Sequence, residues 1–256
     1  RSLAFFYSID YFAYIMGKQS FKNYGIRAIT CTTSTAAAGR YAVQEKSERL
    51  IIPDILKKLN ISLEDNLLDI GCGVGTIFIP LSFFVNTATG LDHPDVIERL
   101  KKSYVGRNMK LHGLNFFDFK NYEKKKFTKI LAYSVIQYLS GIEEVKLFCK
   151  KALSLLKPGG LMLIGDVPNV DLKNRFLSSK NGQKFLDKWK KNSFSNDNDK
   201  FASELSEDKK VFIPCDKNIN ELISFLNKLG VSVYILPQPK NLPFGHTRHD
   251  LLLEVF

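Results

Sequence analysis

The sequence predicts an α/β protein built on a mostly parallel sheet. From Leu67 onward, short apolar runs alternate with amphipathic stretches, which is the pattern of repeated β–α–β units. The 256 residues are 45% hydrophobic and 25% charged, so the chain can bury a full-sized core and is too apolar for extensive disorder. This length suits one large α/β unit with insertions as well as two small domains.

The first half of the predicted sheet alternates short strands with helices. A glycine loop ends the first strand, and a helix over 76–85 follows, with Pro80 near its first turns, where a missing N–H costs little. A second helix begins at Pro94, because proline suits the first helical position. The expected strands of this half are 66–70, 88–92 and 109–117.

The second half repeats the pattern with longer helices. Val145, Phe148 and Leu155 share one face at helical spacing, which predicts a helix over 142–156. Lys157-Pro-Gly-Gly160 is a helix stop. A last helix over 219–229 is capped by Gly230. The expected strands are 127–133, 161–164, 231–235 and 250–255.

Two regions fall outside this rhythm. Residues 1–60 are helical in pattern, including an apolar stretch over 3–16, and are expected to form an N-terminal helical cap on a domain that covers 61–256. Residues 168–217 are polar and rich in Lys, Asn and Ser, with Trp189 among lysines. Because they follow the end of a strand and contain no clear strand pattern, we expect an inserted helical lid.

Composition excludes several classes of protein. The four cysteines are far apart and form no C-x-x-C pair, so a zinc knuckle or a disulfide framework is not expected. We expect reduced thiols and a cytoplasmic protein instead. The longest uncharged run, 70–91, contains glycines and a proline and is a poor membrane span. The net charge of +11 permits nucleic acid, anionic membranes or phosphorylated substrates without selecting any of them.

The most informative segment is Leu67-Leu-Asp-Ile-Gly-Cys-Gly-Val-Gly75. Its glycines follow G-x-G-x-G spacing, whereas a dinucleotide fingerprint needs a further glycine where Thr76 stands. Asp69 lies two residues before the first glycine, and a carboxylate there would repel a pyrophosphate and suit a cationic or hydroxyl-bearing ligand. The glycines still allow close approach of the backbone to that ligand. The pattern therefore disfavours a dehydrogenase.

This segment resembles motif I of class I S-adenosylmethionine-dependent methyltransferases. Asp92 matches the acidic residue that binds the ribose hydroxyls in that family, 155–164 resembles its turn into strand five, and 130–139 resembles the segment after strand four that lines its methyl-transfer site. The resemblance covers roughly residues 64–168. It implies a doubly wound, seven-stranded sheet with an antiparallel last strand, S-adenosylmethionine as cofactor, and no required metal.

The adenine-binding segment departs from the family pattern. Family members often read Gly-Asp-Phe-Phe-Asp, and this chain reads Gly113-Leu-Asn-Phe-Phe-Asp118. Either Asn115 holds the adenine amino group, with Phe116 beside the ring, or the loop shifts so that Asp118 does; we favour Asn115. The cofactor-binding residues that the resemblance implies are Tyr41, Asp69, Gly71, Cys72, Gly73, Gly75, Asp92, His93, Asn115, Phe116, Asp118, Tyr133 and Ser134.

The catalytic residues are less clearly marked. Relatives that read Ser-Val-x-His after strand four place a histidine near the methyl group, but this chain has Gln137, which cannot act as a base near neutral pH. An antiparallel last strand would bring the loop 237–249 to the ligand-binding edge of the sheet. We therefore nominate His246 as the base, with a solvent-facing loop histidine as the alternative, and Arg248 as a clamp for a phosphate or carboxylate. Tyr133, Tyr138 and Asp166 point toward the same mouth by strand position.

The leading functional hypothesis is a methyltransferase that acts on oxygen or nitrogen of a small, anionic or sugar-linked metabolite. Bacterial methyltransferases of this type often act in surface-polysaccharide biosynthesis, so we expect that setting. Two alternatives stay open. The net charge of +11 allows an RNA methyltransferase, although nucleic acid is not the expected partner. Asn115 and Gln137, which replace expected residues, allow a catalytically silent domain that keeps the fold for binding.

Overall fold

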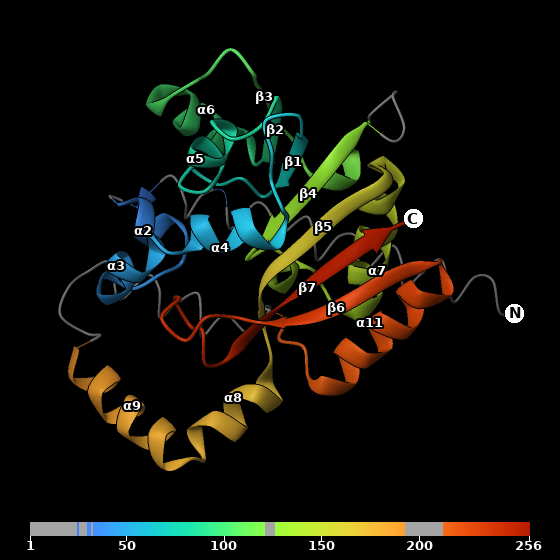
Figure 1. Cartoon of the computed structure of the whole chain (residues 1–256). Coiled ribbons are helices and arrows are strands. Elements are labelled where there is room, and N and C mark those ends of the chain that lie inside the picture. Colours follow the sequence, from blue (N-terminus) through green and yellow to red (C-terminus); the bar gives the residue numbers. More distant parts are fainter. Residues whose placement is uncertain (1–24, 26–29, 32, 121–125, 193–211) are drawn as a thin grey trace, which may run out of the picture.

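The structure is a computed structural model that describes residues 25, 30–31, 33–120, 126–192 and 212–256 (Figure 1). The apolar stretch over 3–16 lies outside the described residues, as does much of the expected lid between 193 and 211. None of the described helices is long and apolar enough to cross a membrane.

A single seven-stranded sheet forms the centre of the molecule, with the strand order β3-β2-β1-β4-β5-β7-β6. Only β7 runs antiparallel to its neighbours. This confirms the predicted seven-stranded sheet with an antiparallel last strand. The strands are β1 Asn66–Ile70, β2 Thr87–Asp92, β3 Met109–Gly113, β4 Phe127–Tyr133, β5 Leu156–Pro168, β6 Val231–Pro237 and β7 Arg248–Val255.

The strand order reverses at β1. From β1 the chain proceeds outward through β2 to β3, and then returns to place β4 on the other side of β1. In open α/β sheets the connections that follow the strands diverge at such a switch point and leave a crevice beyond the carboxyl ends of the strands. The topology therefore places the expected ligand site where β1, β2 and β4 end.

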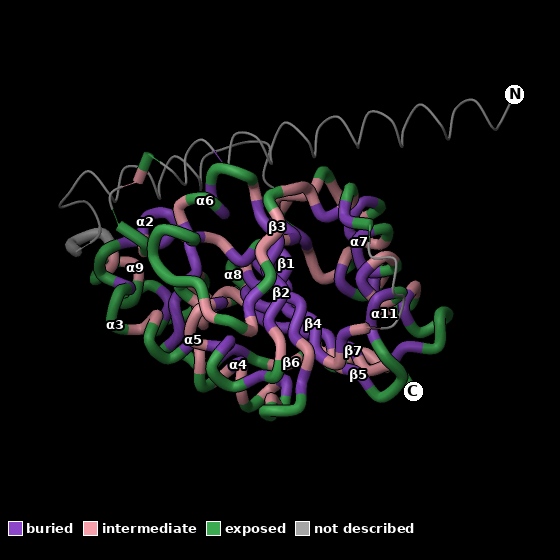
Figure 2. Tube along the Cα trace, turned by 90° about the horizontal axis from the view of Figure 1, so that it is seen from above, coloured by how far each residue is buried: buried purple, intermediate pink, exposed green. Residues whose placement is uncertain are grey.

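Helices cover both faces of the sheet. On one face α4 (Ile51–Lys58), α5 (Phe78–Ser82) and α6 (Pro94–Ser103) pack on the strands, and on the other face α7 (Ile142–Leu155) and α11 (Asp216–Lys228) do. Figure 2 shows the strands as a buried layer between exposed outer segments. Neighbouring strand residues face opposite clusters, since Leu67 contacts the first set of helices and Leu68 the second. The central strands are thus apolar on both faces, as parallel strands require.

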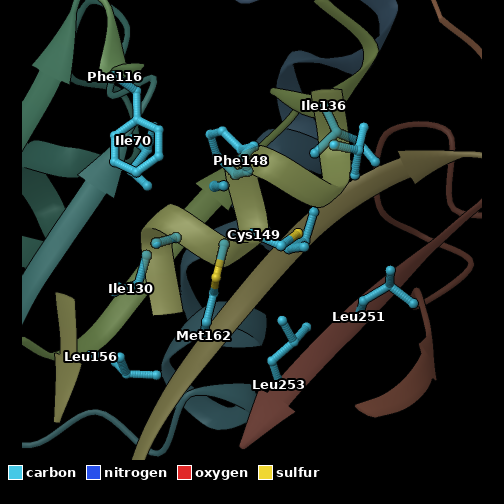
Figure 3. Packing of buried hydrophobic residues seen from close by; sticks show 14 of the residues in the cluster. Ile70, Phe116, Ile130, Ile136, Phe148, Cys149, Leu156, Met162, Leu251 and Leu253 are labelled. Carbon is cyan, nitrogen blue, oxygen red and sulfur yellow. The ribbon is translucent and has the colours of Figure 1, made fainter. Parts of the chain in front are cut away.

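The cluster under α7 and α11 is the larger of the two (Figure 3). Phe148 and Cys149 of α7 pack on Ile130 and Met162 from β4 and β5, and none of these four side chains is more than 1% exposed. All four cysteines carry free thiols. Cys72 and Cys149 are buried in the core, whereas Cys31 and Cys215 are half-buried.

Three elements differ from the sequence-based expectation. Helix α5 covers only 78–82 of the expected 76–85. Pro80 has no N–H to donate to the Thr76 carbonyl, and beyond Ser82 the N–H groups of Phe83 and Phe84 donate to carbonyls three residues back, at 3.3 and 3.0 Å. Strand β3 ends at Gly113, and Phe116–Asp118 forms a 3₁₀ turn instead of the strand's end. Strand β5 starts at Leu156, so the Pro-Gly-Gly segment is an irregularity within a strand, with Gly159 at φ +73°.

The two regions outside the sheet rhythm are helical where they are described. Before α4 come α2 (Ser34–Ala37), the 3₁₀ turn η1 (Ala42–Gln44) and α3 (Glu45–Glu48). Between β5 and α11 come α8 (Val170–Leu177) and α9 (Lys180–Asn192), which form a helical hairpin beyond the end of β5 (Figure 1). Their position at the carboxyl edge of the sheet is the one that a lid over the crevice would need.

Candidate active site

A pocket with about 1140 Å³ of empty space, including solvent at its mouth, lies at the carboxyl ends of β1, β2 and β4. Most of the residues predicted to bind the cofactor line it: Asp69, Gly71, Cys72, Gly73, Asp92, Asn115, Phe116, Tyr133 and Ser134. Tyr41, Gly75, His93 and Asp118 are not among its lining residues. The switch point of the sheet therefore holds a pocket built from the segments that the sequence singled out.

The glycine loop after β1 has left-handed backbone at each of its glycines, with φ +81° at Gly71, +57° at Gly73 and +95° at Gly75. A Cβ at Gly71 would lie 2.6 Å from Cγ2 of Val135, in the segment that follows β4. A Cβ at Gly75 would lie 2.7 Å from Cδ1 of Ile79. Gly75 therefore serves the packing of the loop on α5, whereas Gly71 lets β1 and β4 come together at the pocket.

Two buried carboxylates face this loop. Asp92 is 3% exposed; its Oδ2 accepts from the Gly73 N–H at 2.7 Å and its Oδ1 from the His93 N–H at 2.6 Å. Burial raises the pKa of Asp92 to about 6, although these two backbone donors lower it. Burial and then the charge of Asp92 raise the pKa of Asp69 to about 8. Oδ2 of Asp69 is buried and has no hydrogen-bond partner among the described residues.

The segment after β3 brings an amide and aromatic rings to the pocket. The Asn115 Oδ1 accepts from the Phe117 N–H at 2.9 Å and so caps the 3₁₀ turn. Phe116 is buried and packs against Phe148, with ring centroids 4.9 Å apart. Asp118 is exposed at the outer side of the turn. Of the two residues considered for the adenine amino group, Asn115 is the one that lines the pocket.

The turn after β4 forms the opposite wall. Tyr133 and Ser134 line the pocket, and the Ser134 hydroxyl donates to Oδ2 of Asp166 at 2.5 Å. Gln137 is 8% exposed and donates from Nε2 to the Ser134 carbonyl at 2.9 Å. Gln137 therefore supports the turn from behind, and its replacement of a histidine has no direct bearing on what the pocket can bind.

His246, in the β6–β7 loop, and Arg248, at the start of β7, lie outside the pocket, and His246 contacts α8. The His246 ring stacks on Phe176 of α8, with centroids 4.4 Å apart and an interplanar angle of 2°. Burial and then Lys240 lower the pKa of His246. Arg248 lies over the Phe244 ring at 4.7 Å and donates from Nη1 to the Asp166 carbonyl at 3.0 Å. Neither residue is among those that line the pocket.

Of the remaining predicted residues, Tyr138 lines the pocket, whereas Tyr41 and His93 do not. The Tyr41 ring is buried and meets Trp189 of α9 edge-on, with centroids 5.0 Å apart. His93 caps α6, its Nδ1 accepting from the Asp95 N–H at 3.3 Å.

Among the described residues, no group of three His, Cys, Asp or Glu side chains is arranged to hold a metal ion.

Sequence reasoning missed Arg40. Its side chain lines the pocket at 4% exposure, and its Nη1 lies 3.0 Å from Oε1 of Glu48, whose Oε2 accepts from the Thr35 hydroxyl at 2.7 Å. Burial lowers the pKa of Arg40, but Asp166 and Glu48 outweigh it and raise the pKa above its ordinary value. The one available signal was its place next to Tyr41, because nothing else in the Ala-rich stretch indicates burial.

Together these groups define the ligand that fits. Asp69 offers an unpaired carboxylate oxygen to a cation or N–H donor, Asp92 offers carboxylate oxygens to hydroxyl groups, and Arg40 brings a positive charge for an anion. Phe116 supplies an apolar surface for a flat ring. An amino acid joined to a nucleoside has all four of these features.

Comparisons with known proteins agree with this assignment. A family model described as a methyltransferase domain matches residues 68–164. The ubiquinone biosynthesis O-methyltransferase of Pelagibacter ubique is 28% identical over 148 residues, 55% of this chain and 60% of that protein. An rRNA adenine N-6-methyltransferase of Bacteroides fragilis is 30% identical over 82 residues, 31% of this chain and 30% of that protein. The chain thus spans less than two thirds of either relative.

Solved structures share the fold. Phosphoethanolamine N-methyltransferase 1 of Haemonchus contortus, in complex with phosphoethanolamine and S-adenosylhomocysteine, superposes with a TM-score of 0.64 at 14% identity, over 93% of this chain and 48% of that chain. At this level of identity the likeness concerns the fold, including the sheet that carries the pocket.

Proposed function

We propose, on the premise that this chain contains a class I S-adenosylmethionine-dependent methyltransferase domain, that it methylates an oxygen or nitrogen atom of a small metabolite. The observation that carries the proposal is the single pocket that joins the glycine loop, two buried carboxylates and the turn after β4. S-adenosylmethionine supplies an activated methyl group, and the chain supplies alignment and exclusion of water.

In this proposal the chain holds the cofactor by its two acids and one arginine. Asp92, fixed by the Gly73 and His93 N–H groups, accepts the ribose hydroxyls. The unpaired oxygen of Asp69 accepts from the amino group, and Arg40 binds the carboxylate. Asn115 and Phe116 contact the adenine. Tyr41 and Gly75 support these groups from behind the pocket.

A small acceptor suits the surroundings of the pocket. The carboxyl edge of the sheet also carries α8, α9 and the β6–β7 loop, which meet in a cluster of aromatic rings that includes Phe176, Phe185 and Phe244. Arg248, which lies over the Phe244 ring, is the cation of this cluster that an anionic or sugar-linked acceptor would meet. We keep surface-polysaccharide biosynthesis in the cytoplasm of a bacterium as the proposed setting, on the sequence argument alone.

The test has two steps. Calorimetry with S-adenosylhomocysteine measures whether the pocket binds the cofactor product, and we expect a dissociation constant in the micromolar range or below. Release of S-adenosylhomocysteine is then followed with a panel of amines, phenols, sugar nucleotides and phosphorylated alcohols. Failure of the purified protein to bind S-adenosylhomocysteine would remove the proposal; binding with turnover on one class of the panel would identify the acceptor.

An RNA acceptor is the second candidate, favoured by the similarity to the rRNA methyltransferase and by the exposed lysines 180, 184 and 188 of α9. A protein that neutralises several phosphates loses affinity steeply with salt, by about 10³ or more between 50 and 200 mM for six contacts. Titration of a labelled structured RNA at these two salt concentrations decides the matter. We expect weak binding, and tight binding with a steep salt dependence would replace the small metabolite with RNA.

A further inference from the structure

Two neighbouring strand ends carry non-glycine residues in the left-handed region of the backbone. Ser134 follows β4 with φ +59°, and Asp166 lies in β5 with φ +58°. The register pairs Tyr133 with Gly165, so the two residues come next to each other, and the Ser134 N–H donates to the Gly165 carbonyl at 3.0 Å. Strained backbone of this kind persists where the orientation of a side chain matters, which is often at a functional site.

This backbone conformation orients the hydrogen bond between the side chains of Ser134 and Asp166. Asp166 is 4% exposed and is held from two sides, because its N–H donates to Oδ1 of Asp250 at 2.8 Å and its carbonyl accepts from Arg248. Its Oδ2 accepts the Ser134 hydroxyl proton. Since that proton points at Asp166, the lone pairs of the Ser134 oxygen are left for a donor in the pocket that Ser134 lines.

Buried acceptors without a hydrogen-bond partner lie behind this wall of the pocket. Oδ1 of Asp166 has no hydrogen-bond partner among the described residues, and its neighbour Arg248 has its Nε 3.5 Å away. Oε1 of Gln137 and Oε1 of Gln238 are also buried and unpartnered, while their amide nitrogens donate to Ser134, Tyr133 and Asp250. None of these three residues lines the pocket, so among this group the Ser134 hydroxyl oxygen is the acceptor that a ligand with an N–H or O–H group can reach.

We propose that the Ser134 oxygen accepts the hydrogen bond of the methyl acceptor's reacting N–H or O–H group, with Asp166 as the positioning residue that turns the serine proton away. This subsite rests on the proposed function, because a cofactor with its nucleoside at Asp92 leaves its methyl end on the β4 side of β1. The acceptor is then an amine or a hydroxyl. A carbon nucleophile without a donor, or a carboxylate, does not fit.

Two cofactor analogues test the subsite without knowledge of the acceptor. Sinefungin has an amine-bearing carbon where S-adenosylmethionine has its methylated sulfur, so it places N–H donors at the methyl end, whereas S-adenosylhomocysteine places nothing there. We expect the unmodified protein to bind sinefungin about tenfold more tightly than S-adenosylhomocysteine, since a hydrogen bond to a charged donor is worth about that factor. Calorimetry measures both dissociation constants.

The variants use residues that tolerate left-handed backbone. Ser134→Gly removes the oxygen and Asp166→Asn removes the charge without added backbone strain. Both should weaken the binding of sinefungin more than that of S-adenosylhomocysteine, so that the preference for sinefungin falls to within about twofold. Asp187→Asn, an exposed carboxylate of α9, is the matched control and should keep the preference.

Each outcome separates the subsite from the proposed function. No preference in the unmodified protein, or a preference that survives both variants, would overturn the subsite while cofactor binding stands. A loss of affinity for S-adenosylhomocysteine equal to that for sinefungin would assign Ser134 and Asp166 to the shape of the pocket and overturn it as well. No binding of either analogue would overturn the proposed function and the subsite together.

Discussion

The two ends of the pocket are held in place by different kinds of interaction. At the β1–β2 end, the carboxylate of Asp92 is fixed by backbone N–H groups from residues within 20 positions of it, Gly73 and His93. At the β4–β5 end, side chains far apart in the sequence pair with one another, as Lys58 and Asp250 do across 192 positions. The first end is a local structure that a short motif can carry, whereas the second depends on the completed fold.

This difference predicts where substitutions cost stability. Lys58 lies 2.6 Å from both Asp54 and Asp250, and Asp250 is fully buried. Lys58→Met leaves the two carboxylates without their cation, so we expect a loss of about 3–5 kcal/mol in the free energy of unfolding, measured by urea denaturation. Lys101→Met, which removes an exposed pair with Glu98, should cost at most about 0.5 kcal/mol. Equal effects of the two variants would contradict the comparison.

The β1–β2 end should instead respond to pH. In the folded protein the pKa of Asp69 is about 8, above its ordinary value, so the folded state binds a proton that the unfolded state has released between about pH 4 and 8. The stability that this proton provides is complete below pH 4 and is lost as the pH rises through 8.

Relative to Asp69→Asn, which cannot titrate, the unfolding free energy of the unmodified protein should fall by about 2–4 kcal/mol from pH 4 to 8. Urea denaturation of both proteins at pH 4.5, 6 and 8 measures the difference. A difference that stays flat with pH would show that Asp69 is ionised throughout this range.

Cofactor affinity should depend on Asp92 more than on its exposed neighbours. Asp92→Ala removes the carboxylate that we assign to the ribose hydroxyls and should weaken S-adenosylhomocysteine binding by about 1–3 kcal/mol, as measured by calorimetry. Glu98→Ala, an exposed carboxylate of α6, serves as the control and should leave the affinity unchanged. If both variants bind alike, the ribose does not lie at Asp92.

The smallest effect should come from the contact between the β6–β7 loop and the α8–α9 hairpin. His246 stacks on Phe176 and meets Phe185 edge-on at 5.5 Å, so His246→Ala should cost about 0.5–1.5 kcal/mol of stability. Because His246 lies outside the lining of the pocket, affinity for S-adenosylhomocysteine should not change. Once an acceptor is known, the pH profile of turnover tests whether His246 is the base. If His246→Ala has the same pH profile as the unmodified protein, His246 is not the base.

The sequence could predict the local end of the pocket and much of the sheet. Parallel strands buried on both faces leave apolar runs in the sequence, so β1 and β4 were expected near their observed limits. The helix before β6 was also expected near its observed limits. Asp69 and Asp92 lie at the ends of β1 and β2 and Gly71 follows β1, and all three were expected in the pocket from the resemblance to the methyltransferase motifs. A backbone motif and its ligand-binding geometry occupy the same few residues, which makes both visible in the sequence.

The β4–β5 end was less predictable because its partners come from distant segments. Nothing around Arg40 indicates that α3 supplies Glu48 to it, and nothing in the β6–β7 loop indicates that Arg248 reaches Asp166. The loop was expected at the correct edge of the sheet, but strand order alone does not say which side chains enter a pocket. His246 faces the aromatic rings of α8 and α9 instead.

The contact between Tyr41 and Trp189 gives the protein an intrinsic fluorescence signal from one defined position. Trp189 is the only tryptophan in the chain, so all of its indole emission arises from one place on α9, edge-on to the phenol that follows Arg40. Any shift of the hairpin relative to the N-terminal cap changes the surroundings of that indole. Fluorescence during titration with a non-absorbing ligand can therefore report such a shift without a label.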